Sequence, residues 1–311
     1  MRFRPIAALS AAAVSALLLA GCASPASPEA SPSGTVADLC GSAASCGAES
    51  EAVTVDGTQG TDSTATFTAP LEVTEVQRTV LEEGDGELAA GEFVQYAYSV
   101  FDAVTGDKLA SLGYEPGEVL PTQVSAESGG QLFGCDGPGA RIVATAPSTE
   151  TTPAVVYVLD VLDVVPTAAW GQEQAPVDGL PTVVMADDGA PTITVPDADA
   201  PTETQIATLK GGDGPTVASG DTVLVQYTGA LWSDGTVFDS SWENGTPATF
   251  PTTGVVTGFA KALEGQTVGS QVLAVIPPAE GYGDAEQGAI PANSTLVFVV
   301  DILGTQRTAT Q

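Results

Sequence analysis

The sequence predicts an α+β protein that contains two copies of one domain, each an antiparallel β-sheet wrapped around one short α-helix. Three observations predict this fold. The pattern L-x-x-G-D-G occurs at 81–86 and again at 209–214, and V-Q-Y occurs at 94–96 and again at 225–227. Apolar and polar residues alternate along several segments, as in half-buried strands. Only one segment in the second copy has helical periodicity. A repeat period above a hundred residues indicates tandem domains rather than a solenoid.

The strands and the helix of the second copy can be assigned from the pattern of apolar residues. Alternation at 223–227 and at 296–302 predicts two half-buried strands, and Asp234-Gly235 predicts a hairpin turn. The segment 257–265 predicts a short helix, because Phe259, Ala262 and Leu263 fall on one face and Gly265 can adopt the left-handed conformation that ends a helix.

Two further hairpins are predicted outside the repeated segments. The segment 168–202 is rich in Pro, Asp, Ala and Gly, but 181–185 and 191–195 flank Asp188-Gly189 like the strands of a small hairpin, added to a domain edge. The segments 52–55 and 64–67 predict a counterpart ahead of the first copy. The resulting map places a signal peptide at 1–21, a disordered tether at 22–50, a first domain with its hairpin at 51–166, a linker with a hairpin at 167–202 and a second domain at 203–306.

Composition restricts the partners and the chemistry. The chain of 311 residues carries 39 Asp and Glu against 8 Lys and Arg, for a net charge of −31. Such a charge repels nucleic acid phosphates and anionic lipid headgroups, so nucleic acid is excluded as a partner. The chain has no histidine, which excludes Ser-His-Asp triads, Cys-His dyads and imidazole-ligated metals. Catalysis would therefore use no imidazole proton shuttle, and we expect no metal and no cofactor.

The N-terminus has the pattern of an export signal. Arg2 and Arg4 precede an apolar run at 6–20 that is shorter than a transmembrane helix, and the run ends in L-A-G-C at Cys22. This ending resembles the lipobox of bacterial lipoproteins, in which Cys22 is acylated and becomes the mature N-terminus. The alternative is an ordinary signal peptide that contains a cysteine. The first interpretation predicts an exported protein that contacts the outer face of the cytoplasmic membrane only through its lipid anchor, followed by a Ser/Pro/Ala-rich tether.

Maturation at Cys22 would leave three thiols, Cys40, Cys46 and Cys135. An odd number cannot pair completely in an oxidising compartment, so one would stay free or pair outside the chain. Cys40 can pair with Cys46, or either of them can pair with Cys135. Their spacing does not decide between these pairings.

Five motifs occur in a fixed order in the second copy. They are VQYTG ending at Gly229, DGTVFDSS ending at Ser241, VVTGFAKALEGQTVGS ending at Ser270, PPAEGYG ending at Gly283 and IPANSTLVFVVDIL ending at Leu303. In this order they resemble the FKBP-type peptidyl-prolyl cis/trans isomerases. The resemblance implies the same sheet-and-helix fold, rotation of Xaa-Pro bonds in unfolded or exported polypeptides, macrolide inhibitors and no cofactor.

The resemblance also assigns site residues. The apolar walls of a proline-binding cleft correspond to Tyr227, Phe238, Val255, Val256, Phe259, Ile290 and Phe298. The polar positions correspond to Asp239, at the wall, and Tyr282, whose hydroxyl would reach a carbonyl of a substrate or macrolide. The backbone N–H of Val256 is the other donor that the family uses. Phe259 replaces the usual tryptophan of the floor and Ala248 replaces an aromatic wall residue, so both departures put macrolide affinity in doubt.

The first copy lacks part of this set. Aligning Gly106 with Gly235 places Leu109 at the position of Phe238 and Ala110 at the position of Asp239. No loop equivalent to the one with Tyr282 and Ile290 follows. We therefore expect an inactive domain that serves as a spacer, a chaperone-like surface or a partner site.

Three functions remain open from the sequence. The first is an exported, lipid-anchored peptidyl-prolyl isomerase that acts through the second domain. The second is a non-catalytic extracytoplasmic chaperone or peptide-binding lipoprotein that uses the same cleft. The third is a surface scaffold built from the two domains. The isomerase leads, because the site residues are present in one copy and lost in the other.

Overall fold

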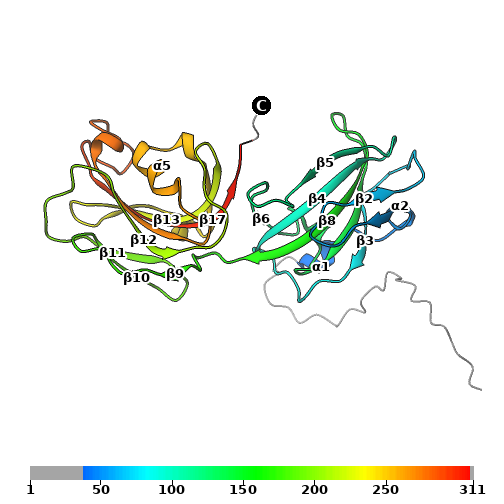
Figure 1. Ribbon diagram of the computed structural model, residues 1–311, viewed down its shortest axis with the longest axis horizontal. Coiled ribbons are helices and arrows are strands. Elements are labelled where there is room, and N and C mark those ends of the chain that lie inside the picture. Colours follow the sequence, from blue (N-terminus) through cyan, green and yellow to red (C-terminus); the bar gives the residue numbers. More distant parts are fainter. Residues whose placement is uncertain (1–37, 309–311) are drawn as a thin grey trace, which may run out of the picture. The chain divides into compact units, whose positions relative to one another are not determined.

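The structure, a computed structural model, describes residues 38–308. The signal peptide, Cys22 and the start of the tether lie outside these residues. The described chain forms a six-stranded sheet, a seven-stranded sheet and two two-stranded sheets (Figure 1). In the described part of the chain, no helix has the length and apolar character needed to cross a membrane.

The seven-stranded sheet belongs to the second repeat. Its strands lie in the order β14-β13-β17-β16-β12-β9, and β15 also pairs with β13. All these pairings are antiparallel. The strands are β9 (Gln172–Glu173), β12 (Gln205–Gly211), β13 (Thr222–Leu231), β14 (Val237–Ser240), β15 (Ala248–Pro251), β16 (Gln271–Ile276) and β17 (Leu296–Gln306). The remaining elements are α4 (Ser241–Asn244), α5 (Thr257–Leu263) and the 3₁₀ turns η1 (Thr252–Gly254) and η2 (Pro278–Glu280).

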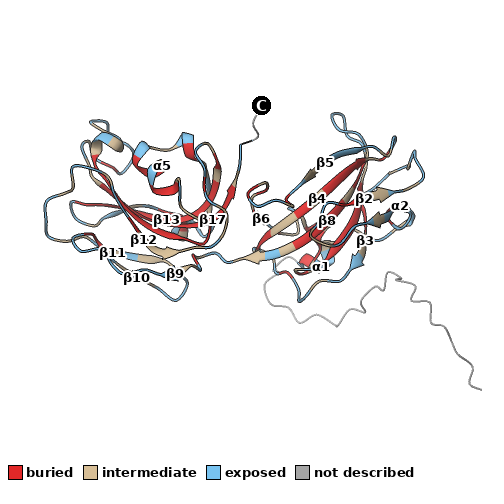
Figure 2. Cartoon of the chain, viewed as in Figure 1, coloured by how far each residue is buried: buried red, intermediate tan, exposed pale blue. Residues whose placement is uncertain are grey.

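The predicted helix is confirmed as α5. Phe259, Ala262 and Leu263 are buried, and Gly265 has the expected left-handed φ of 86°. The helix packs against β16 (Figure 1). A Cβ atom at Gly258 would lie 2.3 Å from a methyl carbon of Ile276, so glycine allows the helix to approach the strand this closely. The apolar core lies between α5 and the sheet, and Figure 2 shows most of β13 and β17 as buried.

The six-stranded sheet belongs to the first repeat. Its order β3-β7-β8-β4-β5, with β6 also on β4, matches the order β12-β16-β17-β13-β14 with β15 on β13. The strands are β3 (Gln77–Glu82), β4 (Phe93–Asp102), β5 (Lys108–Leu112), β6 (Thr122–Gln123), β7 (Arg141–Ala146) and β8 (Val155–Val165). The helix between β6 and β7, α3 (Gly130–Phe133), has four residues, whereas α5, between β15 and β16, has seven. The two sheets thus share a strand order but differ in the helix.

Strand register gives the residue equivalences between the sheets. Tyr157 on β8 pairs with Ala144, as Phe298 on β17 pairs with Ala274. Tyr157 therefore corresponds to Phe298. Val100 pairs with Tyr157 on the other side of β8, and Gly229 pairs with Phe298 in the same way.

The residue equivalent to Tyr227 is Tyr98. Tyr98 precedes Val100 by two positions, as Tyr227 precedes Gly229. The repeated V-Q-Y triplet would align Tyr96 with Tyr227, and the register corrects this alignment by two residues. A shift of two leaves the alternation of side chains between the two faces unchanged, so alternation could not reveal it.

Both predicted hairpins are confirmed. β1 (Thr54–Asp56) pairs with β2 (Thr64–Thr66), and β10 (Thr182–Met185) pairs with β11 (Pro191–Thr194). Apolar residues of the first hairpin pack against Phe101, Val143, Val156 and Val158 of the first sheet. Those of the second pack against Leu273, Val275, Val297 and Val299. Each hairpin therefore covers the face of its sheet opposite the helix, and the edge strand of the second sheet is β9 rather than the hairpin.

A buried ion pair fastens the first hairpin to its sheet. Arg141 and Asp160 are 1% and 0% exposed, and the guanidinium binds both carboxylate oxygens, at 2.7 and 2.9 Å. The guanidinium also donates to the carbonyls of Gly57, Thr58 and Thr61 and to the hydroxyl of Ser63, all in the loop of the hairpin. In the second sheet the same register positions hold Gln271 and Asp301, joined by a 2.7 Å hydrogen bond.

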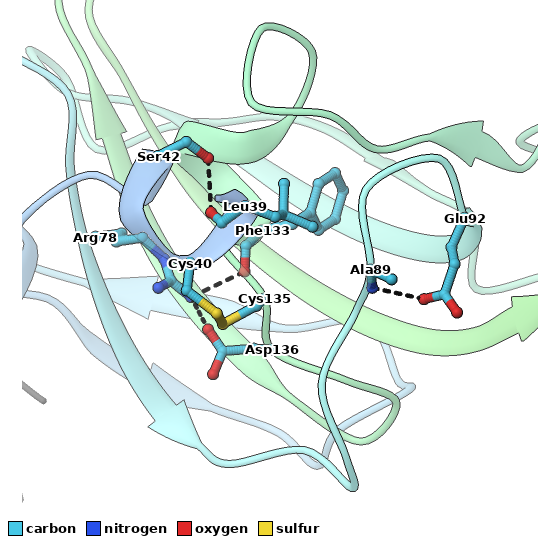
Figure 3. The surroundings of a disulfide bond; sticks show 9 residues. All are labelled: Leu39, Cys40, Ser42, Arg78, Ala89, Glu92, Phe133, Cys135 and Asp136. Atoms are coloured by element: carbon cyan, nitrogen blue, oxygen red, sulfur yellow. Dashed lines mark hydrogen bonds and ion pairs between the residues drawn. A yellow bond between two sulfur atoms is a disulfide. The ribbon is translucent and has the colours of Figure 1, made fainter. Parts of the chain in front are cut away.

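Residues 38–50 differ from the disordered tether that the sequence predicts. They contain the short helices α1 (Leu39–Ser42) and α2 (Ala48–Glu51), and Leu39 is buried in the core of the first sheet. A disulfide joins Cys40 to Cys135, with 4.7 Å between their Cα atoms (Figure 3). This is one of the pairings that the sequence left open. The described residues contain no free cysteine. Burial of Leu39 and the disulfide hold a segment whose composition alone would not order it.

Candidate functional site

The nine predicted site residues come from five parts of the second repeat. Tyr227 lies on β13, Phe238 and Asp239 on β14, and Phe298 on β17. Val255 and Val256 precede α5, which carries Phe259. Tyr282 and Ile290 lie in the loop after η2.

Seven of the nine meet in one apolar cluster. The cluster buries Tyr227, Phe259, Ile290 and Phe298, and Phe238, Val255 and Val256 pack against it partly buried. Phe298 is central to the aromatic part: its ring centroid lies 4.9 Å from that of Phe259 and 5.5 Å from that of Phe238, both edge-to-face. This is the preferred geometry for aromatic pairs. Residues far apart in the sequence therefore converge in one apolar cluster.

Gly229 makes room for these rings. A Cβ atom at this position would lie 2.6 Å from the ring of Phe238 and 2.9 Å from the ring of Phe298. Contacts this short are not tolerated, so any other residue would displace a ring. The register position of Gly229 is occupied by Val100 in the first sheet, which therefore cannot hold the same arrangement.

Tyr227 and Asp239 form the polar side of the cluster. The Tyr227 hydroxyl donates a short hydrogen bond to Oδ2 of Asp239. Burial raises the pKa of Tyr227 above its ordinary value of 10.0, and the hydrogen bond to the Asp239 carboxylate raises it further. The phenol therefore stays neutral and remains a donor well into the alkaline range. The bond fixes a carboxylate beside a largely apolar surface.

Val256 offers a backbone donor at the start of α5. It is the N-cap residue of the helix, and its carbonyl accepts hydrogen bonds from Phe259 and Ala260. Its own N–H donates to no group within residues 38–308. Such N–H groups at a helix start are open to an external acceptor.

Tyr282 is 37% exposed and is not among the residues of the apolar cluster. Its phenol also raises the pKa of Tyr227, after burial and the effects of Asp239. The loop that follows returns through a bridge between Gln287 and Ile290, and Ile290 is buried in the cluster. Of the two residues expected from this loop, Ile290 is therefore buried in the cluster and Tyr282 is exposed.

Phe250 is a cluster residue that the sequence reasoning missed. Its ring lies 5.7 Å from that of Tyr227 and 6.1 Å from that of Phe259. Ala248, two residues earlier on β15, also packs against the cluster. The alternation from Ala248 to Phe250 could have indicated that both side chains face inward. The extra ring packs beside Phe259, where the family resemblance implies a larger floor residue.

The corresponding face of the first sheet lacks these features. Ala110 pairs with Val100 as Asp239 pairs with Gly229, so the carboxylate beside the tyrosine is absent there. Leu109, the expected counterpart of Phe238, is 52% exposed. Among the described residues, no group of three or more His, Cys, Asp or Glu could hold a metal ion.

Comparison with known proteins places residues 214–303 in a family described as FKBP-type peptidyl-prolyl cis-trans isomerase. The chain is 47% identical over 100 residues to the FKBP-type 22 kDa peptidyl-prolyl cis-trans isomerase of Escherichia coli, covering 32% of this chain and 48% of that protein. It is 42% identical over 100 residues to the FKBP-type peptidyl-prolyl cis-trans isomerase FkpA of Aeromonas hydrophila, covering 32% of this chain and 37% of the relative. The chain thus spans less than half the length of these two relatives.

A shorter relative is matched over most of its length. The FK506-binding protein of Streptomyces anulatus is 40% identical over 96 residues, which cover 30% of this chain and 77% of that protein. The family match runs from before β13 to Leu303 within β17 and includes the residues of the cluster around Tyr227. The chain therefore belongs to the FKBP-type peptidyl-prolyl cis-trans isomerase family.

Proposed function

We propose that the second repeat accelerates cis/trans rotation of Xaa-Pro bonds, with the apolar cluster around Tyr227 as the wall of a cleft for the prolyl ring. The observation that carries the proposal is the convergence of seven apolar site residues beside the Tyr227–Asp239 pair. The catalytic surface would consist of Tyr227, Phe238, Asp239, Val255, Val256, Phe259, Tyr282, Ile290 and Phe298.

The reaction suits such a surface. Rotation about the bond meets a barrier of about 18–20 kcal/mol, because resonance keeps the amide planar. The twisted transition state loses much of the amide dipole, which water stabilises in the planar form. An apolar surface that displaces water therefore favours the twisted state relative to the planar one. Lowering the barrier by about 8 kcal/mol would give roughly a millionfold acceleration.

Hydrogen bonds would fix the pose of the peptide. The N–H of Val256 has no partner among the described residues and can donate to a carbonyl next to the proline. The exposed Tyr282 hydroxyl can donate to a second carbonyl. Neither hydrogen bond requires a proton transfer, which agrees with a chain that has no histidine. The same donors and rings would bind a macrolide, with a floor built from Phe259 and Phe250 in place of a larger residue.

The wider organisation is part of the proposal. The shared strand order of the two sheets supports tandem domains, with residues 51–166 as a copy that has lost the site. The sequence around Cys22 supports an exported, lipid-anchored protein that acts on secreted polypeptides.

A protease-free exchange assay on a short Xaa-Pro tetrapeptide tests the proposal with the full chain. We expect catalysis by the wild type, and a decrease in kcat/KM of about tenfold or more in the double variant Asp239→Leu/Tyr282→Ala, which removes two polar contacts. The matched control is Tyr114→Phe in the first repeat, which should leave the rate unchanged. Absence of catalysis by the folded wild type would refute the isomerase. Equal suppression of substrate aggregation by wild type and double variant would then favour the non-catalytic chaperone.

A further inference from the structure

The inner face of the first sheet, which corresponds to the face that carries the cluster around Tyr227, holds three tyrosines. Tyr96, Tyr98 and Tyr157 are partly buried and pack against the core of this sheet. The rings of Tyr96 and Tyr98 are stacked with centroids 6.0 Å apart, and Tyr96 meets Phe133 edge-to-face at 5.3 Å. By register, Tyr98 and Tyr157 occupy the positions of Tyr227 and Phe298. Two aromatic positions of the site are therefore retained, whereas Val100 and Ala110 replace Gly229 and Asp239.

This face is only partly covered. The helix α3 has a single turn, and its Phe133 packs on Tyr96. The disulfide holds α1 beside α3, so Leu39 lies next to Phe133 (Figure 3). Away from this cover, Tyr98 pairs across the strands with Leu112, which is 37% exposed.

The hydroxyl groups of the three tyrosines are available to a ligand. Burial raises the pKa of Tyr98, and the neighbouring phenols of Tyr96 and Tyr157 raise it further, so the Tyr98 hydroxyl stays protonated. Within the described part of the chain, none of the three hydroxyl groups forms a hydrogen bond. No charged side chain contributes to the shift at Tyr98. Flat rings with free donors suit proline-containing segments, whose pyrrolidine rings stack on aromatics and whose exposed carbonyls accept hydrogen bonds.

We propose that the face formed by Tyr96, Tyr98, Tyr157 and Leu112 binds an extended, proline-containing polypeptide segment without rotating its Xaa-Pro bonds. The choice of a prolyl occupant rests on the function proposed for the second sheet, because Tyr98 and Tyr157 stand at two positions of that site. The net charge of −31 selects neutral or cationic segments over acidic ones. The first repeat would thus hold a substrate chain while the second acts on it.

Site-resolved fluorine NMR on the full chain tests this. All six tyrosines are replaced by 3-fluorotyrosine, and signals are assigned by single Tyr→Phe substitutions. The probe is a twelve-residue peptide with proline at every third position and two lysines, compared with the same peptide carrying alanine for proline. We expect a saturable shift of the Tyr98 and Tyr157 signals with the proline peptide, and none with the alanine peptide. Tyr114, whose hydroxyl lies near Ser99 on the opposite face, is the internal control.

Variants separate this site from the catalytic one. Tyr98→Ala should weaken the binding seen at Tyr157 about tenfold or more, as for a buried aromatic anchor, whereas Tyr114→Phe should not. If the alanine variant does not fold, Tyr98→Phe replaces it, because this variant keeps the ring and loses only the hydroxyl; it should weaken binding several-fold.

Saturable shifts of the Tyr227 and Tyr282 signals alone would overturn the proposal and leave the isomerase intact. Shifts of Tyr98 and Tyr157 alone would support it and count against the prolyl site of the second sheet. If the Tyr98 signal shifts with rising protein concentration in the absence of peptide, the face binds a second copy of the chain, and the proposal of a peptide site is overturned.

Discussion

At the scale of single residues, two substitutions separate the two inner faces. Gly229 leaves the space that the rings of Phe238 and Phe298 fill, and Val100 closes it in the first sheet. Asp239 accepts the hydrogen bond of Tyr227, and Ala110 removes that acceptor. The tyrosine itself is present in both sheets, as Tyr227 and as Tyr98. Its neighbours decide whether it is fixed against a carboxylate or left with a free hydroxyl.

The Tyr227→Phe variant tests the role of this hydrogen bond. We expect a loss of about 1 kcal/mol in the free energy of unfolding near neutral pH, the usual value of one such bond, and a several-fold lower kcat/KM. Because the folded pKa of Tyr227 is raised, the unfolded phenol ionises first as the pH rises above 10.0, and the wild type loses stability there. The variant lacks this loss, so the difference between the two proteins shrinks. Urea unfolding at pH 7 and above pH 10 measures the difference in free energy of unfolding between the two proteins. A difference that does not change with pH would contradict a raised pKa of Tyr227 in the folded state.

At the scale of elements, each sheet is covered on both faces by different means. The helix side carries the aromatic residues, and the opposite side carries a hairpin that comes earlier in the chain. The hairpin of the first sheet is held by Arg141, whose guanidinium joins Asp160 to four loop residues. The second sheet holds its preceding segment with Asp301, which accepts the backbone N–H of Ala169.

Replacing Arg141 by methionine should release the hairpin β1–β2. Asp160 would be left buried without a counter-charge, so we expect a loss of about 3–5 kcal/mol in the free energy of unfolding. Hydrogen exchange should accelerate first in residues 54–66. Lys261→Met is the matched control: it breaks the surface pair with Glu280 in the second repeat and should leave the free energy of unfolding nearly unchanged. Equal effects of the two variants would show that the buried pair does not hold the hairpin.

Much of the fold and of the site was predictable from the sequence because both depend on local patterns. Alternation at 223–227 located β13, and the spacing of Phe259, Ala262 and Leu263 located α5. The motif order identified residues that do meet in one cluster. Phe250 was missed because alternation at Ala248 and Phe250 gives only a shared face, whereas contact with Tyr227 depends on the pairing of β15 with β13. Residues 38–50 were misassigned because their order depends on a distant cysteine.

At the scale of the whole molecule, charge is the dominant property. A net charge of −31 on 311 residues acts as self-repulsion in the compact state. Salt bridges offset little of this repulsion, because the described residues form only four of them. The same charge biases binding toward cationic polypeptides at both proposed sites.

Salt should therefore stabilise the folded chain. Raising NaCl from about 0.01 to 0.15 M shortens the screening length from about 30 to 8 Å, so we expect the midpoint of thermal unfolding to rise. The variant Glu83→Gln/Asp197→Asn/Asp199→Asn removes three exposed carboxylates and should show a smaller rise. Calorimetry at a series of salt concentrations measures both. A midpoint that falls or stays level with salt would exclude self-repulsion as a significant term.

The sequence by itself determined the class of fold, the position of α5, both hairpins and the family. Side-chain periodicity and short motifs depend on residues that are close together in the sequence, so they can be recognised without the structure. The tertiary structure alone decided the pairing of Cys40 with Cys135 and the place of Phe250. It also decided that Tyr98, not Tyr96, stands where Tyr227 stands. That last result follows from strand register, which is fixed by pairings and bulges between distant segments. A two-residue offset keeps every side chain on its own face, and so it is invisible in the pattern of a single strand.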